Sequence, residues 1–151
     1  MRRVAFASTL PLFSLLIAVP AHAADWYVSP SGAGTTAAAC PTRDTPCSLA
    51  SAAAGAVAGD TVFLTSGSYT QSLFVANSGT EAAPITFKAD ACSTPIIESL
   101  ASVDADQTTA VHSEKGEYLV FDGIVVRGWS TGFGNRWAGG TDSTEVSNGH
   151  W

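Results

Sequence analysis

Short apolar segments, separated by turn-forming residues, recur from Thr61 onward at intervals of about twelve residues. The segments TVFL, LFVA, ITFKA and PIIES begin at Thr61, Leu73, Ile85 and Pro95. Gly, Ser, Asn, Pro and Asp fill the gaps, as is typical of strands joined by turns. No segment has an evident hairpin partner beside it, so the fold must supply partners from elsewhere in the chain.

Two all-β architectures fit regular short strands: a sandwich of antiparallel hairpins and a parallel β-helix. Hairpins favour tight two-residue turns and clean alternation of apolar and polar residues. Here most connections are longer, and the strands are nearly continuous in Val, Ile, Leu and Phe, although Thr61, Thr86 and Lys88 interrupt them. The sequence therefore predicts a parallel β-helix, in which the strand at 61–64 pairs with the strand one coil further on.

Other segments fit this architecture. Asp25–Gly32 predicts a strand that ends in a Pro-Ser-Gly turn, and Glu117–Trp129 predicts two strands split by a turn at Asp122-Gly123. Ser48–Gly59 is the one candidate helix, with Ser48 as its N-cap and Gly59 at its end. Because a solenoid exposes its interior at each end, we expect this helix to cap the first coil. The face expected to be buried comprises Leu49, Ala53, Ala56 and Val57.

The first residues have the pattern of a secretory signal peptide: Arg2 and Arg3, an apolar stretch, and a small-x-small site at 21–23. A transmembrane anchor is disfavoured because no charged stop-transfer pattern follows. The sequence thus predicts a signal peptide over 1–23 and one domain over 24–151, the N-terminal cap and first coils of the β-helix. We expect a soluble secreted protein, extracellular or periplasmic, with no membrane contact after the signal is removed.

The chain is acidic, with 13 Asp and Glu against 7 Lys and Arg and a formal net charge of −6. Removal of Arg2 and Arg3 with the signal peptide makes the balance more negative. This charge disfavours nucleic acid and anionic lipid as partners. It also disfavours a polyanionic sugar, unless a cation bridges the two.

The three cysteines are Cys40, Cys47 and Cys92. Export into an oxidising compartment and the polar loop PTRDTP between the first two predict a local disulfide between Cys40 and Cys47. A metal site there is disfavoured because two cysteines with no nearby His cannot hold zinc. Cys92 is then either buried and free or paired with a cysteine outside this chain.

The order of these elements resembles the N-terminal part of secreted right-handed parallel β-helix proteins of the pectate-lyase-like superfamily, such as polysaccharide lyase families 9 and 6. The shared features are the cap helix, the Gly59-Asp60-Thr61-Val62 run, Gly67-x-Tyr69, the segment from Gly79 to Thr86 and the strand pair around Asp122-Gly123. The resemblance covers about 100 residues, from Tyr27 to Trp129, and implies a right-handed parallel β-helix.

Lyases of this kind remove the proton α to a uronate carboxylate, with Lys or Arg as the base and Ca²⁺ on the carboxylate. The resemblance therefore implies calcium in the full-length protein, and none on this segment. Their catalytic motif is not matched in these residues, so no catalytic residue is assigned. We interpret the chain as an N-terminal fragment that is inactive alone, and expect the full-length protein to be a monomer.

The segment Arg127–Gly140 holds the best candidates for binding an acidic glycan: Arg127, Arg136 and Trp137. Aromatic rings stack on sugars, and Arg can bind a carboxylate with two N–H groups. The alternative is a long loop whose large aromatics, Trp129 and Phe133 included, pack back on the solenoid.

Other polar residues favour structural interpretations. Asp104 and Asp106 are interpreted as part of a solvated loop rather than a calcium pair, and His112 with Glu114 and Lys115 as a hydrophilic turn. Lys88 is expected on the outside of a coil, and Asp60 and Asp122 are interpreted as turn residues.

The leading hypothesis for the function is the N-terminal segment of a secreted uronate-polymer lyase acting by β-elimination. The alternative is a non-catalytic β-helix surface, adhesion or glycan-binding protein.

Overall fold

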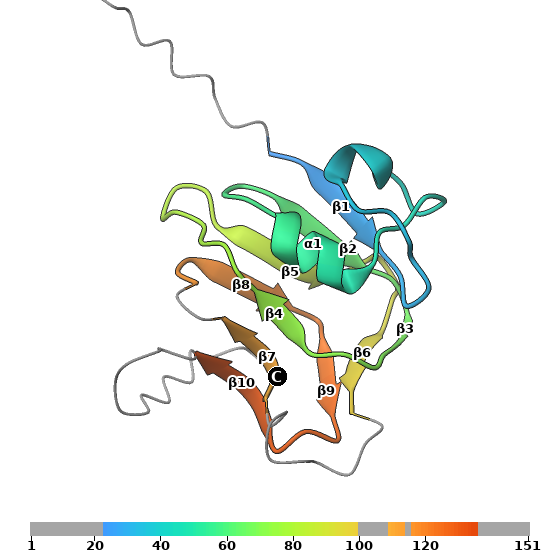
Figure 1. Cartoon of the computed structure of the whole chain (residues 1–151), viewed down its shortest axis with the longest axis vertical. Coiled ribbons are helices and arrows are strands. Elements are labelled where there is room, and N and C mark those ends of the chain that lie inside the picture. The colour runs from blue at the N-terminus through green and yellow to red at the C-terminus, as the bar shows by residue number, and fades with distance from the viewer. Residues whose placement is uncertain (1–22, 100–108, 114–115, 136–151) are drawn as a thin grey trace, which may run out of the picture.

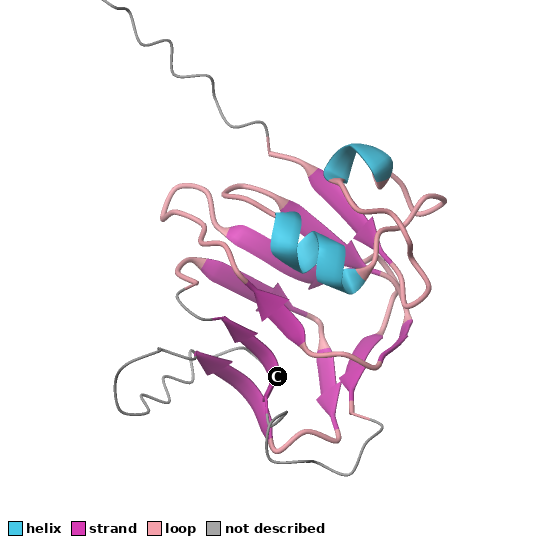
Figure 2. Cartoon of the chain, in the orientation of Figure 1, coloured by secondary structure: helices cyan, strands magenta, loops and turns pink. Residues whose placement is uncertain are grey.

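The computed structural model describes residues 23–99, 109–113 and 116–135, and within them the chain is a parallel β-helix (Figure 1). The residues expected to form the signal peptide lie outside this range, apart from Ala23. In these described residues, ten strands form three parallel sheets, with one α-helix and one short 3-10 helix beside them (Figure 2).

The first sheet, sheet A, contains β1 (Asp25–Val28), β2 (Thr61–Leu64), β5 (Ile85–Ala89) and β8 (Leu119–Asp122), in that order. Sheet B contains β3 (Gly67–Tyr69), β6 (Pro95–Glu98) and β9 (Val125–Arg127). Sheet C contains β4 (Leu73–Val75), β7 (Thr109–Ser113) and β10 (Thr131–Asn135). Each full coil therefore contributes one strand to each of the three sheets.

Strand pairing follows the coils, as the sequence predicted. Strand β2 pairs in parallel with β1 on one side and with β5 on the other. The four strand starts expected at Thr61, Leu73, Ile85 and Pro95 are confirmed, as is the turn at Gly123, where φ is +67°. A parallel partner one coil away satisfies the backbone groups of each short strand without any hairpin.

Side chains alternate between the interior and the outside of each coil, so equivalent positions form stacked rows. The interior rows form the core: Trp26, Val62, Phe87 and Phe121 in sheet A, Tyr69, Ile97 and Val126 in sheet B, and Leu73, Val111 and Phe133 in sheet C. Phe121 joins sheets A and C across this interior, with ring centroids 5.7 Å from those of Phe87 and Phe133.

Three strands lie where the sequence indicated turns or loops, namely β3, β7 and β10. The interpretation of His112 as part of a hydrophilic turn was wrong, because His112 lies in strand β7. The loop proposed from Arg127 to Gly140 contains strand β10. Each of these strands carries Gly or polar residues that lower its β-propensity. Neighbouring strands in the stack supply the hydrogen-bond partners that local sequence does not reveal.

The helix α1 (Leu49–Gly55) is shorter than predicted. Ser48 is its N-cap, with the hydroxyl accepting from Ser51 N at 3.1 Å. Leu49, Ala52, Ala53 and Ala56 are buried, but Val57 lies beyond the helix and is 49% exposed. The expected burial of Val57 was therefore wrong, and Gly59 does not end the helix, since it occupies a later turn at φ +92°.

Helix α1 packs against β4 and β1, at the end of the stack where the first coil begins (Figure 1). A Cβ at Gly55 would come within 2.7 Å of the Trp26 ring, so glycine permits this close approach. Asn77, two residues after β4, donates its side-chain amide to the carbonyls of Ala54 at 3.1 Å and Ala56 at 2.8 Å. These contacts fix the helix as the cap of the first coil.

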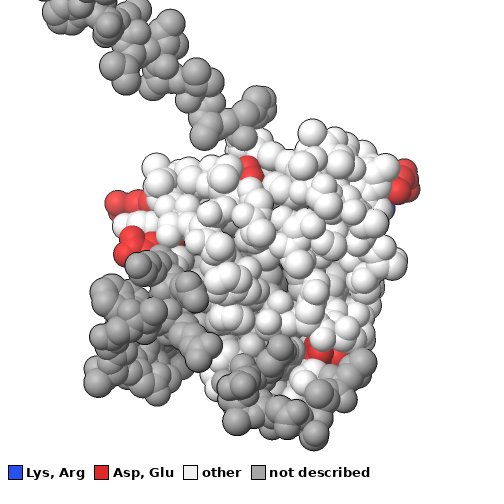
Figure 3. All heavy atoms as spheres, in the orientation of Figure 1, with Lys and Arg blue, Asp and Glu red and all other residues white. Residues whose placement is uncertain are grey.

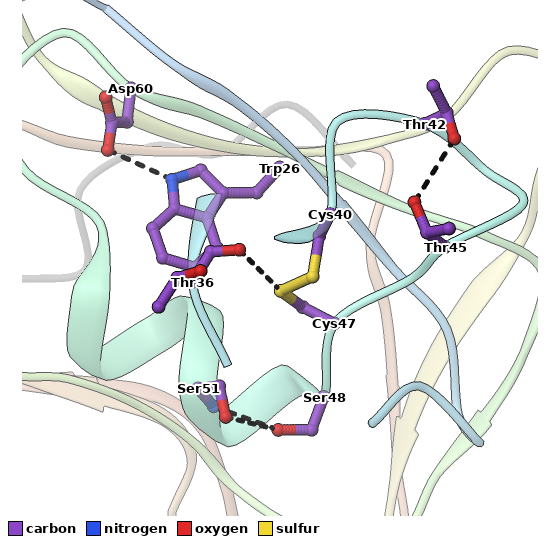
Figure 4. The surroundings of a disulfide bond; sticks show 9 residues. All are labelled: Trp26, Thr36, Cys40, Thr42, Thr45, Cys47, Ser48, Ser51 and Asp60. Carbon is purple, nitrogen blue, oxygen red and sulfur yellow. Dashed lines mark hydrogen bonds between the residues drawn. A yellow bond between two sulfur atoms is a disulfide. The ribbon is translucent and has the colours of Figure 1, made fainter. Parts of the chain in front are cut away.

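The Cys40–Cys47 disulfide is confirmed and lies fully buried beside β1 (Figure 4). Tyr27 N donates to Cys40 O at 3.0 Å, and Cys47 N donates to Tyr27 O at 2.7 Å. The disulfide loop thus covers the edge of β1 that β2 leaves open, which protects an edge strand from association. Cys92 is free and exposed, so the alternative that it is buried was wrong.

Candidate functional site

The outer face of sheet A brings together side chains from four strands that are distant in sequence. In register from β1 to β8 they are Tyr27, Phe63, Lys88 and Asp122, here called the outer row. Their Cα positions follow one another across the strands because the pairing keeps the same register from coil to coil. The outer row lies one position along each strand from the buried core row.

Aromatic rings and a cation occupy the outer row. The Tyr27 and Phe63 rings stack with centroids 5.1 Å apart and an interplanar angle of 15°. Lys88 Nζ lies 5.6 Å from the Phe63 centroid, on the side where β5 follows β2. This distance is within the range of a cation–π interaction, which holds the ammonium close to the sheet.

The three cationic side chains among the described residues differ in their partners. Arg43 forms an ion pair with the buried Asp90, and its Nη2 donates to Oδ1 at 2.7 Å. Arg127 forms an ion pair with Glu98, with Nη2 at 2.7 Å and Nε at 3.3 Å from Oε2. Lys88 is in neither pair, so within the described part of the chain it is the cation that has no carboxylate partner.

Titration behaviour reflects these two ion pairs. The hydrogen bond and the charge of Asp90 raise the pKa of the Arg43 guanidinium above its ordinary value. A hydrogen bond from Ser68, followed by the hydrogen bond from Arg127, lowers the pKa of the Glu98 carboxyl. Both arginines are therefore engaged by carboxylates of their own chain.

The outer row matches the chemistry of a uronate sugar. Such a sugar presents carbon-bound hydrogens on its ring and a carboxylate beside them. The aromatic pair offers apolar contact, and the Lys88 ammonium offers a charge-assisted hydrogen bond to a carboxylate. Asp122, at the next position along the row, can accept hydrogen bonds from sugar hydroxyls or contribute an oxygen to a bridging cation.

Of the three glycan-binding residues predicted from the sequence, the structure describes only Arg127. Arg127 ends β9 on sheet B, exposed and paired with Glu98. Arg136 and Trp137 lie outside the described residues, so their proximity to Arg127 stays a prediction. Four further polar residues also lie outside the described residues, so their structural interpretations stay predictions: Asp104, Asp106, Glu114 and Lys115.

Two aromatic residues near Arg127 pack inward in part. Trp129 and Phe133 are partly buried against the core, which agrees with the alternative that large aromatics of this segment pack back on the solenoid. His112 lies on the outer face of sheet C, with its ring centroid 4.9 Å from that of Phe74. Sheet C therefore has an aromatic pair of its own, without a cation beside it in the described structure.

The described residues contain no cluster of three or more His, Cys, Asp or Glu side chains suited to a metal ion. The calcium expected for the full-length protein remains a prediction.

Among the described residues, no helix is both long and apolar enough to cross a membrane. On the face that carries α1 and β4, acidic side chains lie near the margins and the centre is uncharged (Figure 3).

Sequence reasoning placed Lys88 on the outside of a coil, but it missed Tyr27 and Phe63 as its neighbours. The alternation within TVFL and DWYV places these rings on the same side as Lys88 once the register is known. The sequence does not give the number of residues from one coil to the equivalent position in the next. The connections between strands vary in length, so the pairing of Phe63 with Lys88 could not be predicted. Without that number the residues cannot be assigned to one row.

Comparisons with known proteins agree with this architecture. No protein-family model and no curated protein matches the sequence. The crystal structure of pectate lyase Pel9A is similar to this chain with a TM-score of 0.53 and 24% sequence identity. The similar region covers 66% of this chain and 27% of the lyase, so the chain spans about a quarter of the length of that enzyme. This similarity shows the parallel β-helix fold.

Proposed function

We propose that this β-helix binds acidic polysaccharide along the outer face of sheet A, and that it belongs to a secreted lyase that cleaves uronate polymers by β-elimination. The observation that carries the proposal is Lys88, a cation without a carboxylate partner among the described residues, held beside the stacked rings of Tyr27 and Phe63. The similarity to a pectate lyase supports the choice of polymer. The buried disulfide supports an oxidising, extracytoplasmic location.

The acidic net charge of −6 sets a condition on this binding. A polyanion approaches an acidic protein against a repulsive potential, which calcium reduces by binding carboxylates of both. We therefore expect calcium to strengthen the association. Lys88 then contributes at short range, where its charge acts on a single carboxylate.

The binding test compares two variants that each remove one positive charge. Lys88→Ala removes the unpaired ammonium of sheet A, and Arg127→Ala removes the paired guanidinium of sheet B. Affinity electrophoresis in gels containing polygalacturonate, alginate or chondroitin, with calcium, measures the dissociation constant. We expect Lys88→Ala to weaken binding about tenfold, equivalent to roughly 1.4 kcal/mol, and Arg127→Ala to weaken it much less.

Equal losses in the two variants would show that only net charge matters and would overturn the assignment to sheet A. A larger loss for Arg127→Ala would favour the segment around Arg127 instead. Ultraviolet absorbance of unsaturated uronate products, measured on the same samples, separates a lyase from a protein that binds without cleaving. Binding without cleavage by the full-length protein would favour the non-catalytic glycan-binding alternative.

A further inference from the structure

Asp60 is a buried carboxylate to which the proposed glycan binding gives no role. Its side chain joins the start of the chain to the first coil, and the residue is 2% exposed. Oδ2 accepts hydrogen bonds from Trp26 Nε1 and Val57 N, both at 3.0 Å, and Oδ1 accepts from Ala24 N at 2.8 Å. Figure 4 shows the Trp26 indole pointing toward this carboxylate. The expectation that Asp60 is only a turn residue was therefore incomplete.

The Asp60 carboxylate has N–H donors but no cationic side chain in contact with it among the described residues. A buried carboxylate without a counter-charge carries a large desolvation cost, which neutral N–H donors offset only in part. Buried carboxylates are ordinarily paired with a cation or bound to a metal. Among the described residues, no cationic side chain therefore balances the charge of this carboxylate.

Ala24 also follows directly after the predicted signal-peptidase site at Ala21–Ala23. Its carbonyl accepts from Thr61 N at 3.0 Å, and β1 begins at the next residue, Asp25. Both the amide and the carbonyl of Ala24 are thus bound to the segment 60–61. The chain enters the β-helix at the residue that cleavage would make the first.

We propose that cleavage after Ala23 creates an α-ammonium group at Ala24 that forms a buried ion pair with Asp60. Water hydrolyses the Ala23–Ala24 peptide bond under catalysis by the export peptidase. Its oxygen goes to the Ala23 carboxylate of the released peptide, and the Ala24 nitrogen becomes an amine, which is protonated at neutral pH. The nitrogen is already 2.8 Å from Oδ1, so this pair forms without any change in backbone position.

Processing then changes the electrostatics of the cap without changing its fold. Before cleavage, the Ala24 amide offers Asp60 one neutral N–H group. After cleavage, the ammonium offers a full positive charge and a charge-assisted hydrogen bond, which is about twice as strong as a neutral one. The first coil of the exported chain is therefore more stable than that of its precursor. This inference is independent of the proposed glycan binding.

A comparison of two chemical forms isolates the charge. One form begins with a free amine at Ala24, and the other carries an N-acetyl group there, which restores a neutral amide of the same shape as the precursor's. We expect the free-amine form to have an unfolding equilibrium constant at least about tenfold smaller at pH 7. In the Asp60→Asn background the difference between the two forms should disappear, whereas Asp25→Asn, next in sequence but exposed, should preserve it.

If Asp60→Asn fails to fold, NMR of the unsubstituted protein labelled with nitrogen-15 at Ala24 provides the second measurement. A buried, hydrogen-bonded ammonium exchanges its protons with water slowly, so its signal should be observable at neutral pH. Equal stabilities of the free-amine and acetylated forms would overturn the proposal. A fast-exchanging amine would also overturn it, as would an exported protein that mass spectrometry finds to begin at any residue other than Ala24.

Discussion

Tyr69 shows at the residue scale how one side chain ties two coils of the β-helix together. It is buried at the end of β3, and its hydroxyl oxygen lies 3.0 Å from both Val28 O and Thr65 O. The single phenolic proton is therefore shared between a carbonyl of β1 and one of the turn after β2. Burial raises the pKa of Tyr69 to about 12.

This raised pKa predicts a loss of stability in alkaline solution. The unfolded phenol ionises near pH 10, whereas the folded phenol stays protonated to about pH 12. Between these values the unfolded state binds fewer protons, so the free energy of unfolding falls as pH rises. Below pH 10 the contribution is complete. Urea titrations at pH 8 and pH 11 measure the change.

The variant Tyr69→Phe keeps the buried ring and removes the proton. At pH 8 we expect a loss of about 1 kcal/mol, the value of one hydrogen bond. Between pH 8 and pH 11 the variant should lose less stability than the unsubstituted chain. An equal alkaline loss in both proteins would show that another group is responsible.

The sequence predicted the structural roles of some residues but not of others. The local disulfide followed from the short polar loop between Cys40 and Cys47, because both partners lie in one segment. The role of Asp60 did not follow, since its donors Ala24, just before β1, and Trp26, in β1, lie more than thirty residues away in sequence. Long-range contacts of single polar side chains need the register between coils, which one sequence does not contain.

At the scale of the element, the cap helix predicts a sharp difference between two substitutions that add the same charge. Leu49 is 1% exposed in α1, whereas Val57 is 49% exposed beyond it. We expect Leu49→Asp to lower the free energy of unfolding by at least about 3 kcal/mol, because it creates a cavity and buries a charge without a partner. Val57→Asp should change it by less than about 0.5 kcal/mol.

Thermal and urea unfolding of the two helix variants provides the measurement, and light scattering reports association through an uncovered first coil. The account of α1 as a cap would be contradicted if Leu49→Asp remained as stable and monomeric as Val57→Asp. It would also be contradicted if Val57→Asp alone caused association.

The disulfide loop predicts a second effect at this scale. Replacing both Cys40 and Cys47 by Ser should cost about 2–3 kcal/mol, because the unfolded chain regains the freedom that a short closed loop removes. It should also release the edge of β1 and increase association. Cys92→Ser is the matched control, because Cys92 is free and exposed and its replacement should leave stability unchanged. Equal stability of the double variant and the control would refute this role of the loop.

Elements with apolar runs were predictable, and elements defined by their neighbours were not. Strands β2, β4, β5 and β6 begin at the predicted residues, because each has alternate buried apolar side chains. Strand β10 was missed, since its sequence TGFGN has one apolar side chain between two glycines. It is a strand because β7 beside it supplies a parallel partner.

At the scale of the whole molecule, stacking converts separate segments into continuous surfaces. Each coil adds one residue to the outer row of sheet A, so the row extends along the axis of the β-helix. An extended polymer can contact successive coils of such a surface. Sheets B and C differ from sheet A here, because Arg127 on sheet B is paired with Glu98 and Phe74 on sheet C is next to His112.

The most direct test of the central claim maps which sheet contacts the glycan. Proton–nitrogen NMR spectra of the chain are recorded with a short oligogalacturonate and calcium at increasing concentrations. We predict saturable shifts of the backbone amides of Tyr27, Phe63 and Lys88 on sheet A, with little change at Ile96 on sheet B or Phe74 on sheet C. Shifts centred on sheet B or sheet C, or no saturable shift on sheet A, would contradict the account.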